Sequence, residues 1–258
     1  MIKNIIVVAS GKGGVGKSTV ALNLAITLAR LKKFKVGLLD ADVYGPSVPK
    51  MIGISEKPRL SKTKKMLPYQ KFSIFAMSIG NMIPENEAII WRGPMASGAI
   101  KQMLNDVEWG DLDFLIIDLP PGTGDIQLSL CQNLKINGAV IVSTPQEVSL
   151  IDVRKAINMF KKVNVSILGI IQNMSYLKID EKKNYLFGKN GAFEESKKQN
   201  LKFLGEIPIY SEISNAGDSG IPLTSKNNSC INNVFENISD QLIESLDKDK
   251  TYDVKISN

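Results

Sequence analysis

The sequence predicts an α/β fold, a single doubly wound domain with a mostly parallel sheet flanked by helices. Short and almost wholly apolar runs recur along the chain, as is typical of strands that are buried on both faces. Segments with helical spacing of apolar residues alternate with these runs, and a glycine-rich loop joins the first run to the first helix. We expect one domain over residues 1–246 and a polar, disordered tail over residues 247–258.

The glycine-rich loop lies between a strand expected over residues 3–9 and a helix expected over residues 18–31. It reads Gly11-Lys12-Gly13-Gly14-Val15-Gly16-Lys17-Ser18-Thr19, which contains the Gly-x-x-x-x-Gly-Lys-Ser spacing of a phosphate-binding P-loop. Glycines let successive N–H groups turn toward an anion, and the start of the helix adds positive charge. The loop therefore predicts a P-loop NTPase with an ATP site, in which Lys17 reaches the β- and γ-phosphates and Ser18 binds Mg²⁺. The alternative is an ordinary glycine-rich turn.

Carboxylates follow two of the predicted strands. Asp40 ends a strand over residues 35–40 and precedes Asp42, and Asp118 ends an apolar strand over residues 113–118. Open α/β sheets place ligands at the carboxyl ends of their strands. The D-F-L-I-I-D run that ends at Asp118 matches the Walker B pattern, so we predict that Asp118 holds Mg²⁺. For Asp40 and Asp42, a turn or a helix cap is the alternative.

The rest of the chain completes the predicted sheet and its helices. A loop with two prolines, residues 119–125, follows Asp118, and its Gly122 N–H is placed to sense a γ-phosphate. We expect a loop or short hairpin over residues 56–71 and a tight surface loop over residues 215–222. Strands are expected over residues 72–78, 138–143, 165–172 and 201–207, and helices over residues 94–107, 126–133, 144–160, 192–199 and 231–246.

Lys12 is an additional lysine that the general P-loop pattern does not require, and the loop thereby reads K-G-G-x-G-K-[ST]. With the D-x-P-P-G-T-G-D run that begins at Asp118, the chain resembles the ParA/MinD/nitrogenase-iron-protein superfamily of deviant Walker A ATPases. The resemblance implies an ATP-sandwich homodimer in which Lys12 acts on the partner's nucleotide. It also implies that Asp42 orients the attacking water and that Asn173 and Pro208 lie beside the adenine. A solvated lysine and a strand-end turn are the alternatives for Lys12 and Asn173.

Further segments resemble one branch of the superfamily, the Mrp/ApbC-type iron–sulfur cluster carriers. These segments are Tyr44-Gly45-Pro46-Ser47, Arg92-Gly93-Pro94 and residues 215–222. This resemblance implies ATP hydrolysis coupled to the transfer of iron–sulfur clusters to apoproteins.

The chain departs from that branch at its cluster ligands. Carriers of this type commonly have a C-x-x-C pair soon after the N-M-S-Y run, but residues 177–183 contain no cysteine. The chain has two cysteines, Cys131 and Cys230, and neither identifies a cluster site. A cluster would need other ligands or the thiolates of a partner. Two alternatives stay open: a ParA/MinD-like positioning switch, and an ATP-regulated scaffold of cluster assembly that holds no cluster itself.

Composition limits the partners and the chemistry. There is no histidine, which excludes histidine acid–base catalysis and histidine metal ligands within this chain. No apolar run reaches the length of a membrane span, and no signal peptide is recognisable, so we expect a cytoplasmic protein that does not bind membranes. The net charge of +6 is concentrated in residues 57–65, but nucleic-acid binding there is not the favoured interpretation. The expected partners are a second copy and iron–sulfur apoproteins or assembly factors.

Overall fold

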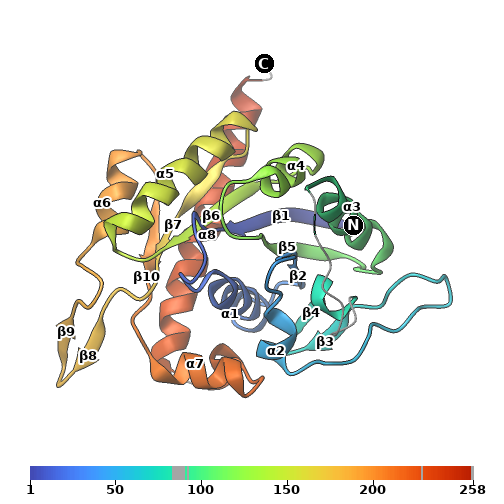
Figure 1. Cartoon of the computed structure of the whole chain (residues 1–258), viewed down its shortest axis with the longest axis horizontal. Helices are drawn as coiled ribbons and strands as arrows, with labels where there is room; N and C mark the ends of the chain where they lie inside the picture. Colours follow the sequence, from blue (N-terminus) through green and yellow to red (C-terminus); the bar gives the residue numbers. More distant parts are fainter. Residues whose placement is uncertain (83–90, 92, 228, 257–258) are drawn as a thin grey trace.

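A parallel sheet dominates the structure, a computed structural model that describes residues 1–82, 91, 93–227 and 229–256. Its strands are β1 (Ile2–Ala9), β2 (Val36–Asp40), β3 (Tyr69–Lys71), β4 (Ile74–Ser78), β5 (Leu112–Asp118), β6 (Gly138–Ser143), β7 (Ile167–Gln172) and β10 (Phe203–Glu206). In the described part of the chain these strands pair in the order β10-β7-β6-β1-β5-β2-β4-β3 (Figure 1). Neighbouring strands are parallel except β3 and β4, which are antiparallel. The predicted doubly wound α/β fold is therefore confirmed.

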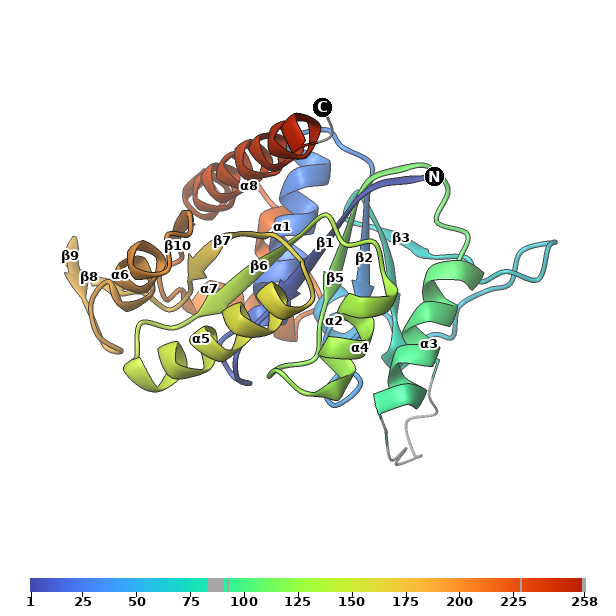
Figure 2. The same ribbon diagram turned by 90° about the horizontal axis from the view of Figure 1, so that it is seen from above.

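Helices cover both faces of this sheet (Figure 2). One layer packs on the face that includes Ile6 and Leu38, and the other on the face that includes Val7 and Leu39. The first layer consists of α1 (Lys17–Arg30), α2 (Val48–Ile52), α7 (Ser211–Asp218) and α8 (Ser229–Ile256). The second consists of α3 (Gly93–Asp106), α4 (Asp125–Asn133), α5 (Glu147–Lys162) and α6 (Gly191–Lys198). Alternate residues of each strand thus enter two separate cores, which explains why the strands read as continuous apolar runs.

Strand order brings the predicted carboxylates together. β5 lies between β1 and β2, and all three run in the same direction. Asp118 is the register partner of both Val8 on β1 and Asp40 on β2. The P-loop leaves β1 at this same edge of the sheet. A ligand site at the ends of β1, β2 and β5 therefore follows from topology, because parallel strands place their carboxyl ends together.

Several short elements were not predicted. A hairpin of β8 (Leu177–Ile179) and β9 (Lys182–Asn184) follows β7, and α2 follows β2. The expectation of a surface loop over residues 215–222 is wrong at its start, because α7 continues to Asp218. Ala216 buries that helix in the first layer, and the turn follows at Ser219 and Gly220, where Gly220 has φ of 68°. Such elements are too short for periodicity to reveal them.

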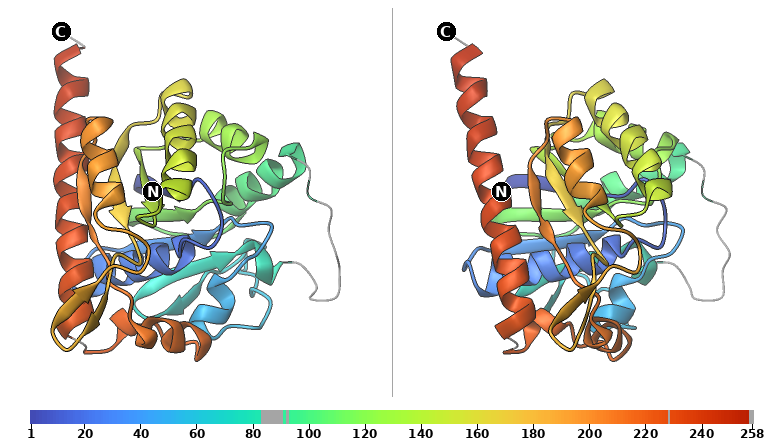
Figure 3. Two further views of the ribbon diagram at one scale, coloured as in Figure 1. Left: turned by 60° about the vertical axis from the view of Figure 1, so that its left-hand side comes forward. Right: turned by 90° about the vertical axis from the view of Figure 1, so that its left-hand side faces the viewer.

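The last helix is longer than predicted. We expected it to end at Leu246, but α8 continues to Ile256, within the segment that we expected to be disordered. No glycine or proline interrupts residues 247–256, and extending an existing helix costs less than starting one. Figure 3 shows this end of α8 reaching past the sheet. Among the described residues, none of the helices combines the length and apolar character that crossing a membrane requires.

The buried face of α8 supports a stability prediction. Leu242 is fully buried where α8 packs against α1 and β10. Leu242→Ala should lower the free energy of unfolding by about 2–5 kcal/mol, since it leaves a cavity in the first layer. Asn237→Ala, at an exposed position of the same helix, should change it by less than about 0.5 kcal/mol. Urea unfolding measures both variants, and equal losses would contradict the placement of α8.

Candidate functional site

The P-loop is held in place by close backbone approaches from two directions. Gly16 ends the loop with φ of 80°, and a Cβ there would lie 2.2 Å from Asn173 Nδ2. At the other end of the loop, a Cβ on Gly11 would lie 2.3 Å from the carbonyl carbon of Asp152 in α5. A side chain at Gly11 would collide with the backbone of α5, and one at Gly16 would be strained by the positive φ and would displace the Asn173 amide. The two glycines therefore let Asn173 and α5 approach the loop directly.

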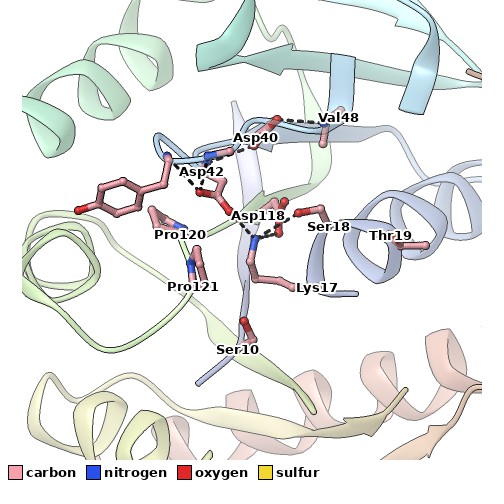
Figure 4. Close-up of polar contacts among 12 residues, drawn as sticks. Ser10, Lys17, Ser18, Thr19, Asp40, Asp42, Val48, Asp118, Pro120 and Pro121 are labelled. Carbon is pink, nitrogen blue, oxygen red and sulfur yellow. Dashed lines mark hydrogen bonds and ion pairs between the residues drawn. The ribbon is translucent and has the colours of Figure 1, made fainter. Parts of the chain in front are cut away.

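Lys17 is the central charge of the site (Figure 4). It begins α1 and is 6% exposed. Its Nζ lies 2.6 Å from Asp118 Oδ1 and 3.4 Å from Asp42 Oδ2. It also donates a hydrogen bond to Ser18 Oγ at 3.3 Å. The structure thus brings together Lys17, Ser18, Asp42 and Asp118, which the sequence placed on three separate segments.

Asp40 lies next to this group but has a structural role. Its carboxylate accepts hydrogen bonds from the Val48 N–H at 3.1 Å, the Asp42 N–H at 3.2 Å and the Ser78 hydroxyl at 2.9 Å. These bonds hold the segment that carries Asp42 and attach it to the start of α2 (Figure 4). Burial, together with the nearby charge of Asp118, raises the pKa of Asp40 to about 7. The turn interpretation of Asp40 is thus the better description of its contacts.

Asp42 is oriented by its own loop. Its Oδ1 accepts from the backbone N–H groups of Tyr44 at 3.2 Å and Gly45 at 3.3 Å, while Oδ2 faces Lys17. The side chain is largely buried. One carboxylate oxygen is therefore engaged by backbone, and the other faces the lysine.

The residues present fit a magnesium ion bound with phosphate. Asp118 Oδ2 is fully buried and accepts no hydrogen bond within the described structure. Burial raises the pKa of Asp118, although the neighbouring Lys17 ammonium opposes this. A cation near Oδ2 would relieve that cost, and the Ser18 hydroxyl on the same segment as Lys17 offers a second hard oxygen. Within the described chain no cluster of three or more acidic or thiol ligands forms a metal site.

The loop after β5 is attached to the P-loop by residues that sequence reasoning missed. The Gly122 N–H donates to the Ser10 carbonyl at 2.9 Å, and Gly122 has φ of 93°. Gln127 Nε2 donates to the carbonyls of Pro120 at 3.0 Å and Pro121 at 2.7 Å. The Ser10 contact joins separate segments, so no local pattern marks it, while Gln127 fastens the loop to the α4 helix that follows it. In this conformation the Gly122 N–H is engaged by the protein itself.

A cavity of about 440 Å³ opens beside the end of the P-loop. Its walls are mostly apolar, with a few polar groups, as is usual for sites that take a flat organic ring. Asn173 lies in its wall, where Nδ2 donates to the Val15 carbonyl of the P-loop at 2.9 Å. Pro208 lines the same cavity, together with Gly16, Thr19 and Tyr210. The structure therefore places both predicted adenine residues in one cavity that adjoins the phosphate loop.

Lys12 makes no contact with this group within the described structure. The Lys12 side chain is half-buried, and within the described structure its amine forms no hydrogen bond or ion pair. Arg92, from the predicted R-G-P segment, lies outside the described residues. The amine of Lys12 thus has no hydrogen-bond or ion-pair partner in the described part of its own chain.

Both cysteines are free and lie in different environments. Cys131 is buried in α4, and burial raises the pKa of its thiol to about 12. Cys230 is exposed at the start of α8, where its sulfur lies 3.1 Å from the Tyr210 hydroxyl. They do not form a pair of neighbouring thiols. The chain's own thiols therefore offer no C-x-x-C-like cluster site.

The β8–β9 hairpin occupies the segment in which the carriers that this chain resembles commonly have a C-x-x-C pair. Lys183 Nζ lies 4.1 Å from the centre of the Tyr176 ring and 3.0 Å from Glu206 Oε1. Tyr176 packs edge-on against Tyr185 at 6.1 Å. Cation–π, ion-pair and ring contacts thus hold this hairpin against Tyr176 and Glu206.

Comparison with known proteins agrees with this geometry. The family model described as "ParA: NUBPL iron-transfer P-loop NTPase" matches residues 1–243. The chain is 46% identical to the "Iron-sulfur protein required for NADH dehydrogenase, mitochondrial" of Arabidopsis thaliana, over 95% of this chain and 79% of that protein. It is 50% identical to the "Iron-sulfur cluster carrier protein" of Aquifex aeolicus, over 86% of this chain and 62% of that protein.

A solved structure resembles most of this chain as well. The nucleotide-binding protein of Archaeoglobus fulgidus in complex with ADP superposes with a TM-score of 0.75 and 42% sequence identity. The match covers 85% of this chain and 87% of the other. With a family model that matches almost its whole length and relatives of this identity, the chain belongs to the NUBPL iron-transfer family of ParA-type P-loop NTPases.

Proposed function

We propose that this protein binds and hydrolyses ATP with Mg²⁺ and uses that cycle to bind iron–sulfur clusters and transfer them to apoproteins. The observation that carries the ATP half is the contact of Lys17 with both Asp118 and Asp42 at the start of α1. The relatives named as iron–sulfur cluster carriers support the transfer half. A reducing compartment such as the cytoplasm suits two free thiols and a cluster cargo.

Phosphate binding would rearrange the contacts of Lys17. The P-loop N–H groups and the start of α1 attract the phosphates, and Lys17 moves its ammonium from the carboxylates toward the β- and γ-oxygens. Asp118 and Ser18 would then hold Mg²⁺, which neutralises charge on the phosphates during transfer. Asp42, freed from Lys17 and still held by the N–H groups of Tyr44 and Gly45, orients the attacking water.

The same step would switch the loop after β5. A γ-phosphate offers the Gly122 N–H a stronger acceptor than the Ser10 carbonyl that it now contacts. Exchange of that bond transmits nucleotide state to residues 119–125, whose prolines restrict the available conformations. Hydrolysis removes the γ-phosphate, and the Gly122 N–H then bonds to the Ser10 carbonyl again.

A homodimer would complete the site. Lys12 lies on the phosphate loop and has no partner for its amine in the described part of its own chain. A second copy that presents its nucleotide to Lys12 would supply an anion for it. Lys12 would then neutralise charge in the transition state across the interface.

The cluster is cargo, and its ligands must come largely from elsewhere. Cys131 is buried and Cys230 stands alone, so apoproteins or assembly factors would contribute thiolates. The cysteine-free β8–β9 hairpin specifically favours a second candidate function. In that alternative the protein is an ATP-regulated scaffold of cluster assembly that never holds the cluster alone.

Lys17→Ala tests the P-loop. Losing charge-assisted hydrogen bonds to the phosphates should weaken ATP binding by about 100-fold. Lys12→Ala is the matched control: it should keep ATP affinity within about threefold but lose most ATP hydrolysis. Titration calorimetry and phosphate release measure these effects, and thermal melting verifies that both variants fold. Unchanged ATP affinity in Lys17→Ala would overturn the assignment.

Magnesium should stabilise the protein through Asp118. Wild-type protein with ATP and Mg²⁺ should melt at a higher temperature than protein with ATP and a chelator. Saturation at 100 times Kd contributes about 2.7 kcal/mol by mass action. Asp118→Asn should keep the gain from ATP alone and lose the part that depends on Mg²⁺. A magnesium-dependent gain that persists in Asp118→Asn would place the ion elsewhere.

Anaerobic reconstitution distinguishes carrier from scaffold. Incubation with iron and sulfide, followed by gel filtration, should leave little visible absorption on this chain alone, because it lacks a thiol pair. Cys230→Ser should behave like the wild type. A stable absorption band that disappears in Cys230→Ser would show that two copies can hold a cluster through this thiol.

A further inference from the structure

An arm of the chain projects from the body beside α3. It comprises residues 57–67, called the basic arm here, and Figures 1 and 2 show it extending away from the sheet before β3. The arm is remote from the ends of β1, β2 and β5 where the nucleotide residues gather. The proposed ATPase cycle assigns no task to it.

The arm carries most of the chain's net charge. Its residues include five cations and no acid, and every one of the five is exposed: Lys57, Arg59, Lys62, Lys64 and Lys65. The whole chain has a net charge of +6, so the remainder amounts to only +1. Glu56, Asp106 and Glu108 lie at the base, yet the described structure shows none of the five cations in an ion pair. Such a concentration of unpaired positive charge attracts an anionic partner.

The arm is ordered by its own hydrogen bonds. Leu67 N–H donates to the Arg59 carbonyl at 2.8 Å and Ser61 N–H to the Lys65 carbonyl at 2.7 Å, which closes a hairpin. Met66 then exchanges backbone bonds with the end of α3, accepting from Glu108 N–H and donating to the Asp106 carbonyl, both at 2.8 Å. A partner would therefore meet a preorganised surface, and binding would cost little ordering entropy.

Apolar surface accompanies the charge. Leu60 is 64% exposed and Leu67 is 38% exposed. A hollow of about 480 Å³ lies between the arm and α3, lined by Leu60, Met66 and Met82 beside Lys64 and Lys65. Methionine side chains adapt to varied apolar groups. An acidic chain with one apolar side chain could therefore place that side chain in the hollow and its carboxylates on the lysines.

We propose that the basic arm is a docking surface for an acidic segment of a partner protein that carries an apolar anchor residue. A single-stranded nucleic acid fits less well, since residues 57–67 contain no aromatic side chain for base stacking. A lipid bilayer also fits less well, because residues 62–64 at the tip are polar and the apolar surface is concave. The proposal does not depend on cluster transfer.

Peptide binding to the full chain tests this assignment. The probe is a short fluorescent peptide of Asp, Glu and Leu, and its control replaces each acid with the amide. Lys62→Gln/Lys64→Gln/Lys65→Gln should weaken binding about tenfold, the size that three exposed ion pairs give together. Lys161→Gln/Lys162→Gln/Lys198→Gln removes as many exposed lysines from α5 and α6 and should leave affinity unchanged. Fluorescence anisotropy measures both.

Leu60→Ser separates a docking site from general attraction to polyanions. It should weaken the acidic peptide about threefold while leaving the charge of the arm intact. Equal binding by the arm variant and its control, or no effect of Leu60→Ser, would overturn the proposal. So would tighter arm-dependent binding of single-stranded DNA or phosphatidylserine vesicles than of the peptide. ATP binding should be the same in all variants, which shows that each is folded.

Discussion

The buried contact between the Lys17 ammonium and the carboxylates of Asp118 and Asp42 is the constraint on which the site depends. Buried ion pairs seldom stabilise a fold over apolar packing, because desolvation offsets their attraction. Here the desolvation cost exceeds the attraction by more, because Asp40 adds a third buried acid beside a single lysine. A fold selected for stability alone would not keep this group. Its retention is understandable if triphosphate and Mg²⁺ rearrange these charges on binding.

This charge group imposes requirements on distant parts of the chain. Lys17 reaches Asp118 only because the P-loop leaves β1 beside β5. The loop in turn is supported by α5 at Gly11 and by Asn173 at Gly16, where any Cβ would collide. The carbonyl of Ser10, just before the loop, also holds the Gly122 N–H. The P-loop, residues 119–125 and the cavity wall at Asn173 are therefore linked by a few direct contacts.

The sequence predicted much of this because the signals were local or periodic. The P-loop spacing predicted Lys17 and Ser18, an apolar run that ends in an acid predicted Asp118, and the resemblance to a known superfamily predicted Asp42. What it could not predict depends on segments that meet only in the folded chain. Ser10 has no pattern of its own, and the true role of Asp40 required knowing where Val48 and Ser78 lie. Short elements such as β8, β9 and α7 lack enough residues to show a period.

The two halves of the proposed function are supported by different parts of the molecule, and they differ in how fully this chain retains them. For the nucleotide half, Lys17, Ser18, Asp42 and Asp118 lie together at the P-loop, and Asn173 and Pro208 line the adjoining cavity. At the cargo half, the segment after Ser175 has no cysteine, and Tyr176 contacts Lys183 and Tyr185 there. The cluster transfer that we propose therefore depends on thiolates of another chain. In that case the proposed ATP cycle would act by controlling contacts between this chain and the protein that supplies the thiolates.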